Sequence, residues 1–232
     1  MKTTGTDLLR TRLQRLAIAA GFLVLTGLGL AVAKTELRAY FSQQGGSAAA
    51  RLLRQTELLS PGFSYYDTDA AISSCFSGLD ALANPIYSDK ARRQGAGHCA
   101  AMARHILRTT PTHAAARQLL AEAELLLGNP EAAADTLQEA AQLAPNTLWL
   151  VQRRFVLLLR LDPALRRIDQ NGLLTRLIAV PQSRDWLAQI FVSDPAARQL
   201  IEASADALPA GDAQDFLRAI RTKARNAGAN GS

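Results

Sequence analysis

The sequence predicts an all-α protein in which one apolar N-terminal helix precedes a short helical solenoid. Ala and Leu, which favour helix, are abundant, and the long Val/Ile/Thr alternation of strands is absent. Prolines recur at nearly regular intervals in the second half of the chain. With 232 residues, 48% hydrophobic and 20% charged, the chain can form one medium-sized domain with a sizeable core plus an appendage.

Residues 16–33 form the most apolar segment, LAIAAGFLVLTGLGLAVA, which carries no charge. As a helix it spans roughly 27 Å, close to the ~30 Å hydrocarbon core of a bilayer. Arg10, Arg12 and Arg15 precede it, so the positive-inside rule keeps residues 1–15 in the cytoplasm. We therefore expect a single transmembrane helix in contact with lipid. In a Gram-negative cell it anchors the protein in the inner membrane, with the C-terminal domain in the periplasm.

A cleaved signal peptide is the alternative for the same segment. Ala31, Val32 and Ala33 fit the small-x-small cleavage pattern, and the residues before the apolar run are basic. The run is longer than a usual signal-peptide core, however, and helix-compatible sequence continues to Arg38. Both interpretations export the remainder of the chain.

Helix breakers divide the exported part. We expect a juxtamembrane helical linker over residues 34–66, helical repeats over 67–181, capping helices over 182–225 and a disordered tail over 226–232. Before residue 110, where the pattern becomes more regular, the predicted helices are 47–59, 67–83 and 88–108. The predicted helices after residue 181 are 183–191, 195–207 and 212–224.

The repeat is marked by Pro111 and Pro145, which lie 34 residues apart, and by Pro181, which follows 36 residues later. The clearest unit, residues 114–147, begins AAARQLLAEAELLLGNPEAAADTLQEAAQLAP. Small residues let two helices approach closely, and the final proline ends the second helix. The signature positions are Leu120, Ala121, Gly128, Asn129, Pro130, Ala133, Leu137, Ala140 and Pro145.

On these residues the unit resembles the tetratricopeptide repeat (TPR) family, which implies stacked helix pairs that bury their apolar faces against one another. The sequence departs from the family at Arg117 and Glu124, where large aromatic residues are usual. The unit at 148–181 keeps the period but not the small residues, so 67–181 is a degenerate array.

The resemblance also implies a binding face, because the first helix of each pair lines the concave surface of such arrays. The residues it places there are Gln118, Glu122, Leu125, Trp149, Gln152, Arg153 and Val156. Among them Trp149 is the strongest candidate, since exposed aromatic residues anchor interfaces. The alternative is that Trp149 and Val156 pack between neighbouring units.

Cys75 and Cys99 are the two cysteines of the chain. They fall near the middle of two helices that form an antiparallel hairpin around residues 84–87, and an exported protein favours a disulfide. The alternative is a pair of buried thiols that act as small hydrophobic residues.

Other chemistry is not indicated by the sequence. His98 and His105 are two helical turns apart, ~10 Å, too far to share one metal ion without a third element, so we expect solvent-facing histidines. Motifs for catalysis, phosphate binding or haem attachment are absent. Basic and acidic stretches alternate within the net charge of +6, whereas nucleic-acid binders more often show one continuous basic face. We expect no enzyme activity, no cofactor, no metal and no nucleic-acid partner.

These features favour a membrane-anchored periplasmic scaffold that binds protein partners in a cell-envelope complex, such as one for polysaccharide synthesis or export. One alternative is an accessory subunit that packs mainly through its transmembrane helix, where Gly21, Gly27 and Gly29 give a smooth face. Another is a carrier of glycan or peptide ligands.

Overall fold

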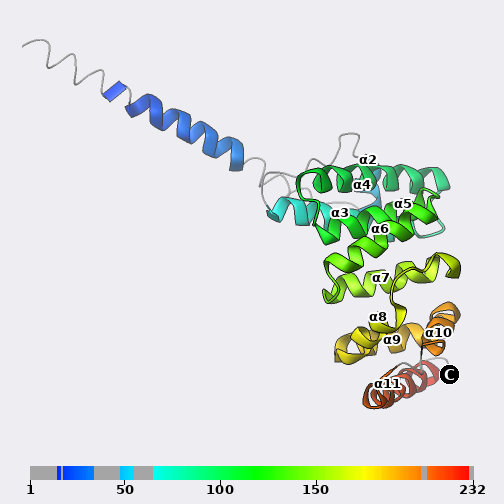
Figure 1. The fold of residues 1–232 in the computed structure, drawn as a ribbon. Coiled ribbons are helices and arrows are strands. Elements are labelled where there is room, and N and C mark those ends of the chain that lie inside the picture. The colour runs from blue at the N-terminus through cyan, green and yellow to red at the C-terminus, as the bar shows by residue number, and fades with distance from the viewer. Residues whose placement is uncertain (1–14, 17, 34–47, 55–64, 205–207, 230–232) are drawn as a thin grey trace, which may run out of the picture.

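The computed structural model describes residues 15–16, 18–33, 48–54, 65–204 and 208–229, and within them it contains helices and no strand, which confirms the all-α prediction (Figure 1). The elements after the N-terminal helix are α2 (Ala48–Arg54), α3 (Tyr65–Leu82), α4 (Asp89–Thr109), α5 (Ala114–Leu126), α6 (Pro130–Leu143), α7 (Leu148–Arg160), the 3₁₀ helix η1 (Pro163–Leu165), α8 (Gln170–Ala179), α9 (Pro181–Ser193), α10 (Pro195–Glu202) and α11 (Ala210–Ala229).

The N-terminal helix lies away from the body of the protein (Figure 1), and its residues 18–33 are all exposed. In the part of the chain that the structure describes, no helix meets both the length and the hydropathy needed to cross a bilayer. The transmembrane helix expected over residues 16–33 therefore stays a prediction. Most of the predicted cytoplasmic segment, 1–15, and of the linker, 34–66, lies outside the described residues.

From α2 onward the helices stack in chain order, with α2, α3 and α4 at the end nearest the N-terminal helix and α11 at the other end (Figure 1). Two buried apolar clusters run through this stack. The first joins α2, α3, α4 and α5 and includes Leu119. The second begins at Ala121 on the same helix α5 and continues to Phe216 on α11. Each helix thus contributes to the core through its neighbours, as expected of a solenoid.

The pair α5–α6 forms as the repeat unit predicts. Gly128 ends α5 with φ +87°, a left-handed conformation that favours glycine. Pro130 occupies the first turn of α6, where its missing N–H costs no hydrogen bond. Ala133, Leu137 and Ala140 are fully buried. The turn and the close helix contact expected from this unit are therefore confirmed.

The predicted helix limits needed several corrections. Helix α3 begins at Tyr65, two residues before the predicted start, so Asp67 lies in its first turn. An acidic residue at this position is favoured by the helix dipole. The 3₁₀ helix η1 lengthens the connection between α7 and α8. Helix α11 reaches Ala229, into the segment 226–232 that was expected to be disordered, because the alanines there favour helix. Helix α4 begins at Asp89, close to the predicted start at residue 88, and Ser88 caps it by accepting from Ala91 N at 3.3 Å.

The structure joins Cys75 on α3 and Cys99 on α4 in a disulfide, with Cα atoms 5.7 Å apart. Both residues are fully buried in the first apolar cluster, and their pairing agrees with the prediction. The bridge fixes α3 against α4 next to Phe76, a residue of the candidate site described below.

Candidate partner-binding site on helices α3, α5 and α7

Three helices each contribute two side chains, four residues apart, to one cluster. Residues at this spacing lie one above the other on the same helix face. We call the group the α3–α5–α7 cluster; its members are Phe76 and Asp80 on α3, Gln118 and Glu122 on α5, and Trp149 and Arg153 on α7.

The aromatic part of the cluster joins α3 to α7. The rings of Phe76 and Trp149 meet edge to face, with centroids 5.8 Å apart, a favoured geometry for aromatic pairs. The guanidinium carbon of Arg153 lies 4.1 Å from the Phe76 ring centroid, so the arginine stacks on this ring as a cation–π contact. Although Phe76 is buried, Trp149 is 44% exposed. The structure therefore presents a fixed tryptophan at the surface.

The charged part of the cluster is organised by Arg153. Its Nη1 and Nη2 donate to Asp80 Oδ2 and Oδ1 at 2.9 and 3.0 Å. Its Nε and Nη2 also donate to Glu122 Oε1 and Oε2 at 2.9 and 2.7 Å. One guanidinium from α7 thus forms bidentate contacts with carboxylates on both α3 and α5, the geometry in which arginine binds carboxylates most strongly.

Burial sets the protonation energetics of this network. Loss of solvent raises the pKa of Glu122 above 4.5, although hydrogen bonds from Arg153 and Gln118 act in the opposite direction. Burial also disfavours the charged form of Arg153, but its bonds to Glu122 and Asp80 outweigh this and raise its pKa above the ordinary value. The arginine therefore stays charged, and its charge and hydrogen bonds favour the ionised form of Glu122.

Gln118 lies fully buried beneath these groups. Its Nε2 donates to Glu122 Oε1 at 3.3 Å, whereas its Oε1 has no hydrogen-bond partner among the residues that the structure describes. Gln118 and Glu122 are therefore both buried, although the family resemblance places both on a ligand-binding face.

The other predicted face residues lie outside the cluster. Gln152 donates to Ser183 Oγ on α9 at 3.1 Å and so joins α7 to α9. Leu125 packs against the second apolar cluster, and Val156 is half-buried. The structure thus brings together Gln118, Glu122, Trp149 and Arg153, but not these three.

Phe76 and Asp80 were not singled out from the sequence. A signal was present, because an aromatic residue followed four positions later by a charged residue occurs on α3 and again on α7. The two pairs are 73 residues apart, as the bond between Arg153 and Asp80 shows. This spacing is close to two repeat periods, so the pairs occupy related positions in their units.

Arg154 has a very different environment from its neighbour Arg153. Its side chain is 2% exposed, and its Nη2 donates to the backbone oxygen of Ala140 at 3.0 Å, in the last turn of α6. Burial, and then the charge of Arg176, lower its pKa to about 10. Among the described residues it forms no ion pair, and its Nε lacks a hydrogen-bond partner.

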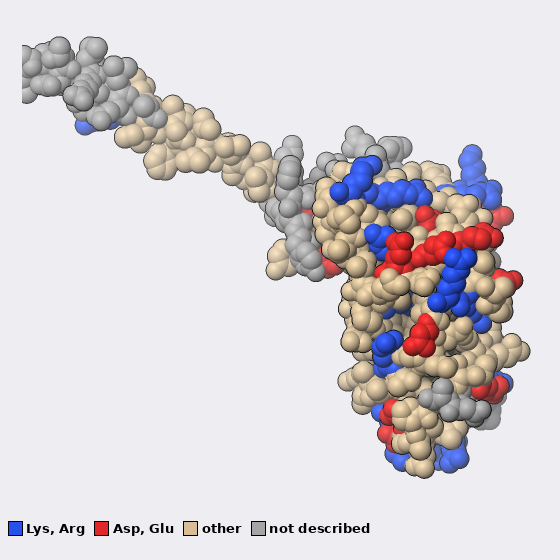
Figure 2. All heavy atoms as spheres, viewed as in Figure 1, with Lys and Arg blue, Asp and Glu red and all other residues tan. Residues whose placement is uncertain are grey.

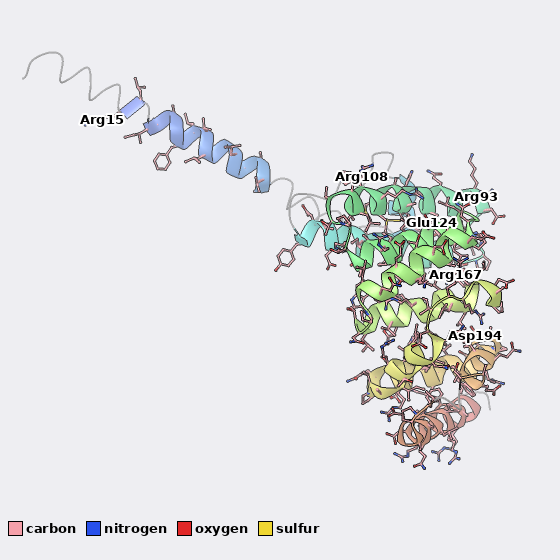
Figure 3. The ribbon with its side chains drawn as sticks, in the orientation of Figure 1. Arg15, Arg93, Arg108, Glu124, Arg167 and Asp194 are labelled. Carbon is pink, nitrogen blue, oxygen red and sulfur yellow. A yellow bond between two sulfur atoms is a disulfide. The ribbon has the colours of Figure 1, made fainter. Side chains whose placement is uncertain are left out.

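The two departures from the repeat pattern on α5 replace aromatic packing with polar contacts. Glu124, labelled in Figure 3, accepts from Arg104 Nη2 at 3.3 Å and Thr136 Oγ1 at 2.9 Å. Arg117 pairs with Glu139 and donates to the backbone oxygen of Pro111. These bonds hold α5 to α4 and α6. Figure 2 shows the resulting surface, on which basic and acidic side chains lie next to one another over the middle of the stack.

The histidines are half-buried, which corrects the expectation that they face solvent. His98 Nδ1 contacts Leu52 O at 3.2 Å, and the ring of His105 contacts Arg108. His113 caps α5 by accepting from Ala116 N at 3.2 Å. Within the described ranges no group of three or more His, Cys, Asp or Glu residues is placed to hold a metal ion.

Comparison with known proteins finds no family model, no curated protein and no solved structure that matches this chain. The tetratricopeptide resemblance therefore depends on the repeat residues themselves.

Proposed function

We propose that the chain is a non-catalytic adaptor whose α3–α5–α7 cluster binds a protein partner. The observation that carries this proposal is Trp149, which is 44% exposed yet fixed by its edge-to-face contact with Phe76. A large aromatic residue held in place on rigid helices is a typical interface anchor, because little conformational freedom is lost when a partner covers it.

The stacked helices support the same proposal. A solenoid offers a broad and rigid surface that is suited to protein binding. The fully buried Ala133 and Ala140, together with the turn at Gly128, support the assignment of α5–α6 to a tetratricopeptide-like repeat. This fold likeness raises the expectation of a binding role, but the partner is decided by the site.

We place the adaptor in the periplasm, anchored in the inner membrane by residues 16–33 as part of an envelope complex. The described part of that segment, Leu16 and residues 18–33, is apolar and exposed, as expected of a helix that meets lipid or another protein. The disulfide between Cys75 and Cys99 supports an oxidising compartment. Alkaline phosphatase fused after Ser232 is expected to be active, and an inactive, stable fusion would contradict this topology.

The binding proposal is tested by placing a photo-crosslinking amino acid at position 149 in cells, followed by mild-detergent purification and mass spectrometry. The matched control carries the same group at Leu217 on α11, which is 51% exposed but far from the cluster. We expect one or a few defined adducts from position 149 that are absent from position 217. A protein that shows no adduct at 149, or the same adducts at both positions, would contradict the proposal.

A second candidate function is a membrane subunit that packs through its N-terminal helix. A side-chain carbon added at Gly21, Gly27 or Gly29 meets no atom within 4 Å, so these positions are open to close approach by another helix. Replacing residues 16–33 with an unrelated membrane anchor separates the two functions, because an adaptor keeps its partner after the exchange and a packing subunit loses it.

A further inference from the structure

We propose that the α3–α5–α7 cluster is a recognition site for a guanidinium group, and that Arg153 occupies the place that an arginine of the protein partner takes on binding. This inference rests on the proposed adaptor function, and it adds the chemistry of the partner. The internal arginine shows which ligand the site fits, since one ring and two carboxylates surround it.

The cluster contains more acceptors than Arg153 satisfies. Asp80 and Glu122 contribute two negative charges and Arg153 one positive charge, which leaves −1 in the cluster. The exposed side of Asp80, 54% accessible, can accept further hydrogen bonds. A cation that approaches Trp149 therefore meets a negative site bounded by an aromatic ring, the combination that attracts guanidinium groups.

Gln118 gives an independent indication of a missing donor. It is fully buried, and within the described part of the chain its Oε1 has no hydrogen-bond partner while its Nε2 donates to Glu122. Buried acceptors are normally satisfied, and each exception calls for an explanation. A guanidinium has five N–H donors in a planar fork, and one that enters in a shifted position can serve both Glu122 and Gln118.

Exchange does not require the core to open. The side chain of Arg153 is 22% exposed and reaches Asp80 at the surface, so it can rotate outward while the helices stay folded. The hydrogen bonds of Arg153 to Asp80 and Glu122 compete with the ligand. In the free protein only a small fraction of molecules therefore has Arg153 turned outward, and the apparent affinity for the ligand is reduced by that fraction. Removing Arg153 removes the competition.

The chain as a whole disfavours non-specific binding of cations, because its net charge is +6. A cationic peptide that binds must therefore find a local negative site. This makes a short peptide a useful probe, since its charge alone does not draw it to the protein.

The test uses the full chain with Trp186→Phe, so that Trp149 is the one tryptophan that reports. The probe is the peptide acetyl-Gly-Arg-Gly-amide, and its control has citrulline, which keeps the shape and loses the charge. We expect the arginine peptide to change Trp149 fluorescence saturably and the citrulline peptide to leave it unchanged. Arg153→Ala is expected to bind the arginine peptide at least about tenfold more tightly, and adding Asp80→Asn to Arg153→Ala is expected to weaken that binding several-fold.

Equal or weaker binding by Arg153→Ala, or equal binding of the two peptides, would overturn the proposal. The comparison of the arginine and citrulline peptides on the chain that keeps Arg153 tests the site even if Arg153→Ala does not fold. The adaptor function is judged separately. If a partner is cross-linked at position 149 and excess arginine peptide does not reduce the adduct, the adaptor function is supported and the guanidinium site is refuted.

Discussion

Replacing each of two adjacent arginines by methionine is expected to have opposite effects on stability. Arg153→Met leaves Glu122 buried with Gln118 as its remaining hydrogen-bond partner. Breaking a buried ion pair on one side costs roughly 3–5 kcal/mol. We expect a loss of stability of about 3 kcal/mol, at the low end of this range. Asp80 is half exposed, so water screens the loss of its contact with Arg153, and Glu122 can take up a proton.

Arg154→Met removes a buried charge that has no carboxylate partner among the described residues. The lowered pKa of Arg154, about 10 against 12.5, means that its charge costs free energy in the folded state at neutral pH. The shift corresponds to at most about 3 kcal/mol. The substitution loses one hydrogen bond, worth about 1 kcal/mol, but Ala140 O keeps its bond from Ala144 N at 3.3 Å. We therefore expect stability to stay unchanged or to rise by up to about 2 kcal/mol.

Thermal and urea denaturation followed by circular dichroism measure both variants against the wild-type protein. In a chain of this size, 1 kcal/mol corresponds to about 2–4 °C in melting temperature, so Arg153→Met should melt roughly 6–12 °C lower. Adding Glu122→Gln to Arg153→Met should recover part of that loss. Similar destabilisation by both arginine substitutions, or none by Arg153→Met, would refute the roles assigned to the two side chains.

Three further predictions concern the helix pairs and the buried acid. Replacing Cys75 and Cys99 by alanine should lower the free energy of unfolding by about 3.5 kcal/mol on the loop-entropy estimate for their separation of 24 residues; reduced wild-type protein is the matched control, and an unchanged urea midpoint in both would contradict it. Gly128→Ala should cost about 1–2 kcal/mol, because φ there is +87°, whereas Gly97→Ala, with open space around it, should cost nothing. The pKa of Glu122 is raised in the folded state, so its contribution to stability is complete below pH 4.5 and is lost as the pH rises through the raised pKa. Glu122→Gln should therefore flatten the dependence of stability on pH in this range. If the variant shows the same pH dependence as the wild-type protein, Glu122 is not the cause of that dependence.

Much of the fold could be predicted because its signals are local. Gly128 and Pro130 determine the turn between α5 and α6 through their own backbone preferences, and Ser88 supplies the oxygen that caps α4. The cysteines could be paired because both lie on one hairpin, where helix geometry limits their separation. None of these predictions required knowledge of how distant units are arranged.

The candidate site could be predicted only in part because it depends on that arrangement. Repeat position identified Trp149 and Arg153, but whether they meet Phe76 and Asp80, 73 residues earlier, depends on how tightly the stack curves. Sequence also does not separate Arg153 from Arg154, since a helix directs adjacent side chains to different surroundings, one beside two acids and the other beside a helix end.

The position of Arg153 links the curvature of the stack to the availability of its binding surface. Its bonds join α7 to α3 and α5 at once, so they hold the first helices of three successive pairs together on one side. A ligand that takes over Glu122 and Asp80 from Arg153 would break these ion pairs, and the ring contact between Phe76 and Trp149 would still join α3 to α7. Because neighbouring units in a solenoid interact mainly with each other, the effect would be a local change in curvature between α5 and α7. The disulfide keeps α3 on α4 throughout, so the N-terminal end of the stack would stay rigid while the part from α7 to α11 changes its orientation.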